Sequence, residues 1–123
     1  MKYIQSDKAP KVVGPYSQAI EANGLVFCSG QIGIDPDAGT LVEGIENQTK
    51  QVLDNLKHVL EEAGSGLEKV VKSTVYLSDI SDYSKMNEIY SQYFTDHKPA
   101  RAAFAVAALP LKALIEIEMV AVK

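Results

Sequence analysis

Apolar residues recur at helical spacing in two segments of the chain, and this period predicts two α-helices. The first is expected over residues 46–63, ahead of Gly64 as a C-terminal stop, with an apolar face formed by Val52, Leu56, Val59, Leu60 and Ala63. The second is expected over residues 81–95, with Ser81 as its N-terminal cap and an apolar face formed by Met86, Ile89, Tyr90 and Tyr93.

The remaining apolar segments predict strands. The Asn23-Gly24 pair lies between two short apolar runs, which is a strong hairpin signal because a type I′ turn needs positive φ at both central residues. The segment VVKSTVYL is rich in β-branched residues, and RAAFAVAAL reads as a strand or a buried extended segment. Strands are therefore expected at residues 2–5, 17–22, 25–32, 70–77, 101–109 and 113–122.

Two helices are too few to cover both faces of such a sheet, so we expect them to cover one face. In the last strand, one set of alternating residues is fully apolar and suits the helices: Ile115, Ile117, Met119 and Ala121. The other set mixes carboxylates with large apolar groups: Leu114, Glu116, Glu118, Val120 and Val122. We interpret this second face as a subunit interface that holds a polar site.

The composition is that of an ordinary globular chain and excludes several function classes. Its 123 residues fit one domain, 1–123, and 46% apolar residues suffice for a sizeable core. A net charge of -4 provides no general attraction to a polyphosphate backbone, so nucleic acid is not expected as a partner. The only cysteine, Cys28, excludes an internal disulfide and suits a reducing cytosol. We expect a cytoplasmic protein without membrane contact, since no segment resembles a signal peptide or a membrane span.

The chain contains a single arginine, Arg101, at the start of the apolar segment RAAFAVAAL. A guanidinium grips a carboxylate through two parallel hydrogen bonds, best where water is partly excluded, so Arg101 is a candidate clamp for a substrate carboxylate. A structural ion pair with an internal acid such as Glu116 explains the same residue equally well. The residues alone leave both interpretations open.

Glu116 and Glu118 are candidates for acid–base chemistry because they share one face of the last strand. A carboxylate near an apolar interface can have a raised pKa and act as general acid or base, although two carboxylates on a strand are more often simply solvated. The two histidines, His58 and His97, have no neighbours at metal-ligand spacing, so no metal is expected.

Two loop and strand motifs add candidate ligand contacts. Tyr16, in GPYSQ, fits a pocket wall, and it equally fits a surface turn with the ring packed down. Ser29 and Gly30, in CSGQI, fit hydrogen bonds to a ligand at a point where another group approaches the strand, and they equally fit a β-bulge.

Six motifs follow one another between Gly14 and Val122, and the sequence pattern that they mark extends back to about residue 3. They are GPYSQAI, CSGQI, QTKQVLDNLKHVLEEAG, VVKSTVYLSD, MNEIYSQYF and KPARAAFAVAALPLKALIEIEMVAV. In this order and without large gaps, they resemble the YjgF/YER057c/UK114 family, and more closely its RidA branch of reactive intermediate (enamine/imine) deaminases. The ending PAR…LP…EIE is the most specific part of the resemblance.

This resemblance implies a mixed α/β (α+β) fold similar to chorismate mutase, assembled as a homotrimer with three sites between subunits. It implies cofactor-free hydrolysis of 2-enamine or 2-imine acids, such as 2-aminoacrylate and 2-iminobutyrate, to 2-keto acids and ammonia. By motif, Arg101 would bind the substrate carboxylate and Glu116 would position the water. The substrate-binding residues would be Tyr16, Ser29, Gly30, Asn87, Arg101 and Ala103.

One position departs from the family pattern. Members often carry Arg-Ser-Cys where this chain has Arg101-Ala102-Ala103, so only the backbone could act at Ala103. The implied chemistry suits the remaining residues, because an imine carbon is already electrophilic and needs a held carboxylate, an oriented water and a proton source. Two alternatives stay open: a non-enzymatic regulatory protein that binds a keto acid, and a translation inhibitor or endoribonuclease. Chorismate mutase activity is disfavoured, since one arginine grips only one of the two carboxylates of chorismate.

Overall fold

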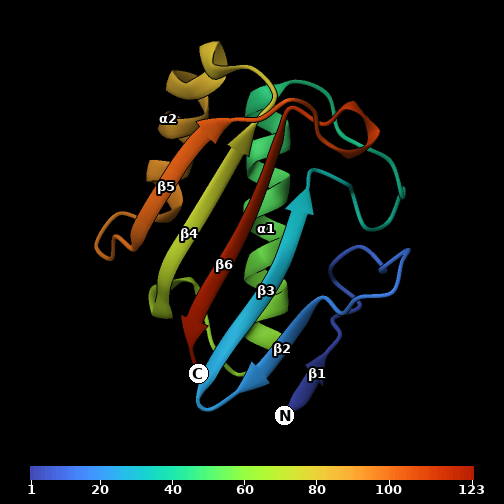
Figure 1. Cartoon of the computed structure of the whole chain (residues 1–123), viewed down its shortest axis with the longest axis vertical. Helices are drawn as coiled ribbons and strands as arrows, with labels where there is room; N and C mark the ends of the chain where they lie inside the picture. The colour runs from blue at the N-terminus through green and yellow to red at the C-terminus, as the bar shows by residue number, and fades with distance from the viewer.

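The computed structural model describes residues 1–123 and contains six strands and two α-helices (Figure 1). In chain order the elements are β1 Lys2–Ile4, β2 Ala19–Ala22, β3 Leu25–Ile32, α1 Ile45–Glu62, β4 Val70–Leu77, α2 Tyr83–Tyr93, β5 Ala100–Ala105 and β6 Ile115–Val122. Short 3-10 helices lie at Leu67–Lys69, Ile80–Asp82 and Pro110–Lys112.

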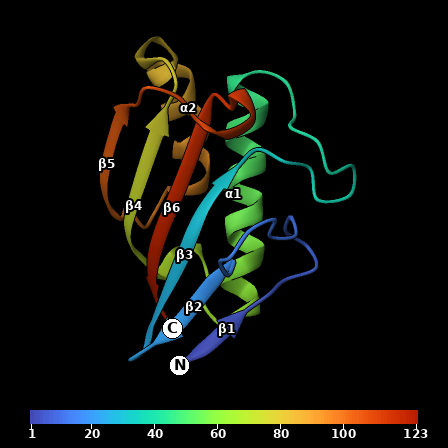
Figure 2. The same ribbon diagram turned by 45° about the vertical axis from the view of Figure 1, so that its right-hand side comes forward.

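The strands form one mixed sheet in the order β1-β2-β3-β6-β4-β5 (Figure 2). β4 and β5 run parallel, and every other neighbouring pair is antiparallel. The last strand of the chain, β6, therefore lies in the middle of the sheet between β3 and β4, whereas β5 forms one edge. The predicted mixed sheet is confirmed, and its central strand carries both Glu116 and Glu118.

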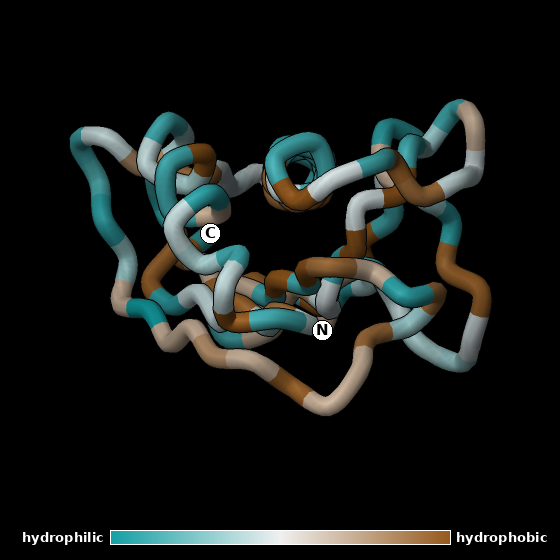
Figure 3. Tube along the Cα trace, turned by 90° about the horizontal axis from the view of Figure 1, so that it is seen from above, coloured by the Kyte–Doolittle hydropathy of each residue, from teal (hydrophilic) through white to brown (hydrophobic).

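Both helices lie on the same face of the sheet, as predicted (Figure 3). The apolar stripe of α1 is fully buried and packs in one core with the inward residues of β6: Val52, Leu56, Val59 and Leu60 from the helix, and Ile115, Ile117, Met119 and Ala121 from the strand. Because the buried residues of β6 face α1 in this core, the residues that alternate with them face away from the helices. Neither helix has the length and apolar character needed to cross a membrane.

The opposite face of the sheet has no helix over it. Its large apolar side chains, Phe27, Phe104 and Val122, keep 45%, 46% and 44% of their surface exposed. Glu116 and Glu118 alternate with the buried residues of β6 and so lie on this uncovered face. The predicted mixture of carboxylates and apolar groups on one face is therefore present.

The hairpin between β2 and β3 turns at Asn23 and Gly24, as predicted. Their φ values of 52° and 77° are the positive pair that a type I′ turn needs. β2 begins at Ala19 rather than at residue 17. The Gln18 side chain binds the N-terminal loop: its amide oxygen accepts from the Ser6 N–H at 2.6 Å, and its amide nitrogen donates to the Pro10 carbonyl at 3.0 Å. Gln18 thus fastens the N-terminal loop to the sheet.

One local prediction was wrong, and another was confirmed only in part. Ser81 does not cap the second helix; it lies inside the 3-10 helix Ile80–Asp82, and its N–H and hydroxyl both donate to the Asp79 carboxylate, at 2.9 Å and 2.7 Å. α2 starts only at Tyr83. RAAFAVAAL forms the predicted strand, but β5 ends at Ala105 rather than at residue 109, and its residues are half-buried or exposed at the edge of the sheet.

Replacing a core residue of α1 should destabilise the fold strongly. Leu56 is 0% exposed, so Leu56→Ala should lower the free energy of unfolding by about 2–5 kcal/mol through lost apolar burial and the cavity left behind. Urea unfolding at a fixed protein concentration measures this loss. Val13→Ala is the control, because Val13 is 91% exposed and its replacement should change stability by less than about 0.5 kcal/mol. Equal losses at both positions would contradict the core described above.

Candidate functional site

The predicted site residues fall into two groups on opposite faces of the sheet. Arg101 pairs in register with Ser73, which is 0% exposed beneath the helices. Glu116 pairs with Tyr76, which lies on the uncovered face. Since cross-strand partners point to the same side of a sheet, the guanidinium and the carboxylate point away from each other.

The first group surrounds Arg101 at the edge of the sheet, between β5 and α2. Its Nη1 donates to Asn87 Oδ1 at 2.8 Å, and its Nη2 donates to the Tyr83 hydroxyl at 2.7 Å. The guanidinium carbon lies 4.7 Å from the centre of the Tyr90 ring. Asn87, expected in the pocket wall, is thus a direct partner of the arginine.

No carboxylate neutralises Arg101 within the chain. The single salt bridge joins Lys123 to Glu21, at 3.2 Å. The ion pair between Arg101 and Glu116, which the sequence left open, is therefore absent. Instead, neutral groups hold the guanidinium, so its positive charge remains available for an anion.

Ala103 lies on the same side of β5 as Arg101, two residues further along. It pairs with the buried Val75 and packs against the edge of the core. Its methyl group offers no polar chemistry, so only its backbone could contact a ligand.

The second group surrounds Gly30 and Glu116. A Cβ on Gly30 would overlap Glu116 Oε2, so the absence of a side chain at Gly30 makes room for the carboxylate. The neighbouring Ser29 hydroxyl donates to the Ser17 carbonyl at 2.6 Å. This bond fastens the loop that carries Tyr16, whose side chain is 52% exposed. The structure thus brings Gly30 and Glu116 together beside Ser29, and Tyr16 lies in the loop that Ser29 holds.

The two carboxylates of β6 differ in their surroundings. Glu118 accepts a hydrogen bond from the Tyr76 hydroxyl, and this bond, together with partial burial, raises the pKa of Tyr76 to about 12. Glu116 has no hydrogen-bond partner, and burial followed by the nearby charge of Glu118 raises its pKa. Glu116 is therefore the carboxylate suited to exchange a proton, whereas Glu118 is occupied.

Sequence reasoning named Asn87 as a site residue but missed Tyr83, and missed the role of Tyr90, in holding Arg101. Tyr83, Asn87 and Tyr90 stand at positions i, i+4 and i+7 and so share one face of α2. The spacing of two tyrosines around Asn87 was the available signal. This spacing indicates a row of hydrogen-bonding side chains along the second helix. Only the register of β5 shows that this row faces Arg101.

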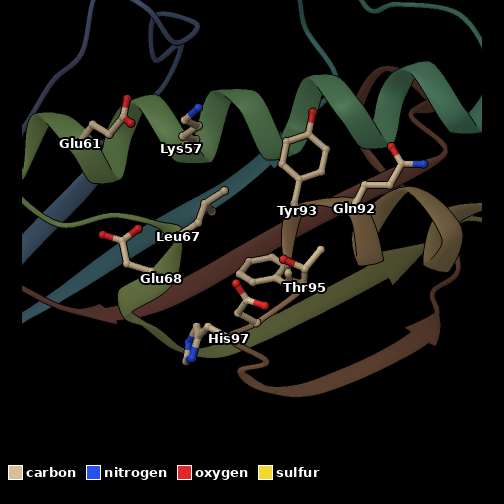
Figure 4. Close-up of a pocket in the computed structure, with 10 residues that line it drawn as sticks. Lys57, Glu61, Leu67, Glu68, Gln92, Tyr93, Thr95 and His97 are labelled. Carbon is tan, nitrogen blue, oxygen red and sulfur yellow. The ribbon is translucent and has the colours of Figure 1, made fainter.

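A separate hollow of about 410 Å³ lies between α1 and the segment that follows α2 (Figure 4). It is lined mainly by polar side chains, among them Lys57, Glu61, Glu68 and His97, and it contains none of the predicted site residues. The residues with the relevant chemistry therefore gather elsewhere, at the β5 edge and on the uncovered face.

Comparisons with known proteins agree on one family. Residues 6–123 match the family described as Endoribonuclease L-PSP. A RutC family protein of Pyrococcus abyssi is 54% identical over 98% of this chain and 95% of its own. The human 2-iminobutanoate/2-iminopropanoate deaminase is 49% identical over 99% of this chain and 90% of its own. The crystal structure of RidA from an Antarctic Psychrobacter superposes with a TM-score of 0.97 at 44% identity and covers 100% of both chains.

The environment of Glu116 predicts an unusual dependence of stability on pH. Because its pKa is raised in the folded chain, the neutral form favours folding; this contribution is complete below the usual carboxyl pKa of 4.5 and is lost as the pH rises through the raised value. Glu116→Gln is neutral at every pH and loses no hydrogen bond. Its Tm should exceed the wild-type Tm at pH 7, and the difference should vanish in acid.

Glu118→Gln provides the matched control for this measurement. It alters the carboxylate that accepts from Tyr76, so its Tm at pH 7 should be lower than that of wild type. Thermal unfolding followed by circular dichroism across the acid range gives all three curves. A Glu116→Gln variant that is less stable than wild type at pH 7 would show that the charged carboxylate is favoured by its surroundings.

Proposed function

Because the chain belongs to the RidA branch of the YjgF/L-PSP family, we propose that it hydrolyses reactive 2-imino acids and their 2-enamine tautomers to 2-keto acids and ammonia. The substrates are of the 2-aminoacrylate and 2-iminobutyrate type. The observation that carries the proposal is the single arginine, Arg101, held by neutral side chains with no carboxylate partner. It supports a binding point for the carboxylate that all these substrates share.

Arg101 holds the substrate by its carboxylate. Two parallel N–H···O bonds fix the position and the orientation of the acid, and therefore also the direction in which the imine carbon points. Asn87 and the backbone at Ala103 line the same side of the ligand. Around the imine carbon stand Glu116 and the polar groups near it, with Tyr16, Ser29 and Gly30 forming the wall.

Hydrolysis proceeds with water as the only co-reactant. Glu116 takes a proton from the water as the water oxygen bonds to C2 of the imine, and passes this proton to the imine nitrogen, which becomes an amine. Glu116 then takes the proton of the new hydroxyl and passes it to the amine nitrogen, while the C2–N bond breaks with its electron pair on nitrogen, leaving a 2-keto acid and ammonia. The raised pKa of Glu116 suits both directions of proton transfer.

The two groups of site residues meet across a subunit boundary in this proposal. Arg101 and Glu116 face opposite sides of one sheet, so one chain cannot direct both at the same small molecule. A homotrimer, with the β5 edge of one chain against the uncovered face of the next, forms three such sites. The exposed apolar groups Phe27, Phe104 and Val122 on that face support burial against another chain.

Two other functions are less well supported. The name of the family points to RNA cleavage, but His58 and His97 each contact a backbone carbonyl, of Lys8 at 3.1 Å and of Val70 at 2.5 Å. These separate contacts do not form a paired acid and base. A keto-acid sensor would use the same Arg101 clamp. Release of ammonia from 2-iminobutyrate distinguishes the enzyme from the sensor.

The proposed compartment is the cytosol. Its support is the free thiol of Cys28, which is buried and whose pKa burial raises to about 12. Such a thiol is a structural apolar group in a reducing environment.

Replacing Arg101 by lysine should abolish most of the activity. Lysine keeps the charge but loses the planar fork, so it cannot hold a carboxylate through two parallel bonds. Loss of a desolvated charged contact typically costs about 2–5 kcal/mol, which is on the order of 30- to 4,000-fold in kcat/KM. The assay adds the protein to a threonine dehydratase reaction and follows loss of the transient imine.

The melting temperature of the same preparation separates this role from a structural one. If Arg101 has only a structural role, Arg101→Lys should lower the Tm, while the protein that remains folded keeps the wild-type kcat/KM. That combination would refute the carboxylate clamp and, with it, the deaminase proposal.

A further inference from the structure

The partners of Arg101 hold the geometry of the guanidinium without neutralising its charge. Tyr83 and Asn87 accept one N–H each, from Nη2 at 2.7 Å and from Nη1 at 2.8 Å. The guanidinium carbon Cζ lies over the Tyr90 ring, 4.7 Å from its centre. Two hydrogen bonds and this ring contact hold the guanidinium at three points, so these side chains restrict both its position and its orientation.

The remaining hydrogen-bonding capacity matches one carboxylate. A guanidinium has five N–H donors, and Arg101 uses two of its N–H groups on Asn87 and Tyr83. Three stay free, and a bidentate carboxylate needs two of them. The Tyr83 hydroxyl thus uses up a donor on Nη2 and leaves enough for the ligand, while it prevents rotation of the fork about its long side chain.

Tyr90 gives this arrangement a rigid base. The residue is only 6% exposed, and burial raises the pKa of its hydroxyl, so the ring stays neutral beneath the cation. The hydroxyls of Tyr90 and of the neighbouring Ser73 are both buried and have no hydrogen-bond partner. Tyr90 therefore presents its ring to Arg101 as a cation–π surface.

We propose that Tyr83 and Tyr90 are positioning residues for Arg101: the Tyr83 hydroxyl and the Tyr90 ring fix the guanidinium in the plane in which it receives the substrate carboxylate. This inference rests on the proposed function, in which Arg101 binds that carboxylate. It adds that α2, through residues at positions i, i+4 and i+7, determines how tightly 2-imino acids bind.

Tyr83→Phe tests the role of the hydroxyl by removing one oxygen atom. The carboxylate contact exists in the ground state and in the transition state alike, so its loss raises KM more than it lowers kcat. The expected result is a KM for 2-iminobutyrate that rises on the order of tenfold, with kcat within about twofold of wild type. The Kd for 2-ketobutyrate, the stable carboxylate product, should rise by the same factor in titration calorimetry without any turnover.

Tyr93→Phe is the matched control, since it makes the same change on the same helix. Its hydroxyl donates to Asp54 at 2.9 Å and does not contact Arg101. Both KM and Kd should therefore stay within about twofold of wild type. At Tyr90 the ring is the relevant group, so Tyr90→Leu should weaken 2-ketobutyrate binding and Tyr90→Phe should recover most of the lost affinity.

The outcomes separate this inference from the proposed function. If Tyr83→Phe keeps the wild-type KM and Kd while Arg101→Lys loses activity, the positioning role is overturned and the deaminase proposal stands. A lower Tm and kcat with an unchanged Kd would show that Tyr83 is merely structural, and would likewise overturn the inference. If the wild-type protein neither binds 2-ketobutyrate nor consumes 2-iminobutyrate, the proposed function fails, and the positioning role fails with it.

Discussion

An unneutralised guanidinium at the edge of the sheet is the feature on which the proposed chemistry depends. Arg101 donates hydrogen bonds to two neutral acceptors, Asn87 and Tyr83, and has no carboxylate partner within the chain. An acidic partner would have fixed the side chain equally well, but it would have cancelled the charge that attracts a small acid. The parallel pairing of β5 with β4 directs Arg101 toward α2, where these neutral partners stand.

The same sheet separates the arginine from the carboxylate that would activate water. Glu116 lies on the uncovered face, where Gly30 makes room for it and where Glu118 is already bonded to Tyr76. Neighbouring residues of a strand point to opposite faces of the sheet. Because Ile115 and Ile117 are buried under the helices, Glu116, which lies between them in β6, points to the uncovered face. One chain thus carries two separate half-sites, one around Arg101 and one around Glu116, and we propose that an assembly of chains combines them.

Most of the fold could be predicted from the sequence because its signals are local. The two helices follow from their apolar spacing, and Asn23-Gly24 fixes the hairpin through backbone sterics. The surroundings of the site could not be predicted in this way. Which face receives Arg101 depends on the register of β5 against β4, and the different roles of Glu116 and Glu118 depend on Tyr76, a residue 42 positions away from Glu118. The prediction of Ser81 as a cap failed because Asp79 caps the preceding 3-10 helix, and its carboxylate accepts both the N–H and the hydroxyl of Ser81.

The central claim is that Arg101 of one chain and Glu116 of another share an active site, and mixing two inactive variants tests it most directly. Arg101→Lys and Glu116→Gln chains are refolded together in equal amounts and assayed for hydrolysis of 2-iminobutyrate. In mixed trimers, sites that combine a wild-type Arg101 with a wild-type Glu116 should form, and activity should return to about one quarter of the wild-type level. A mixture that stays as inactive as its two parents would contradict the shared site.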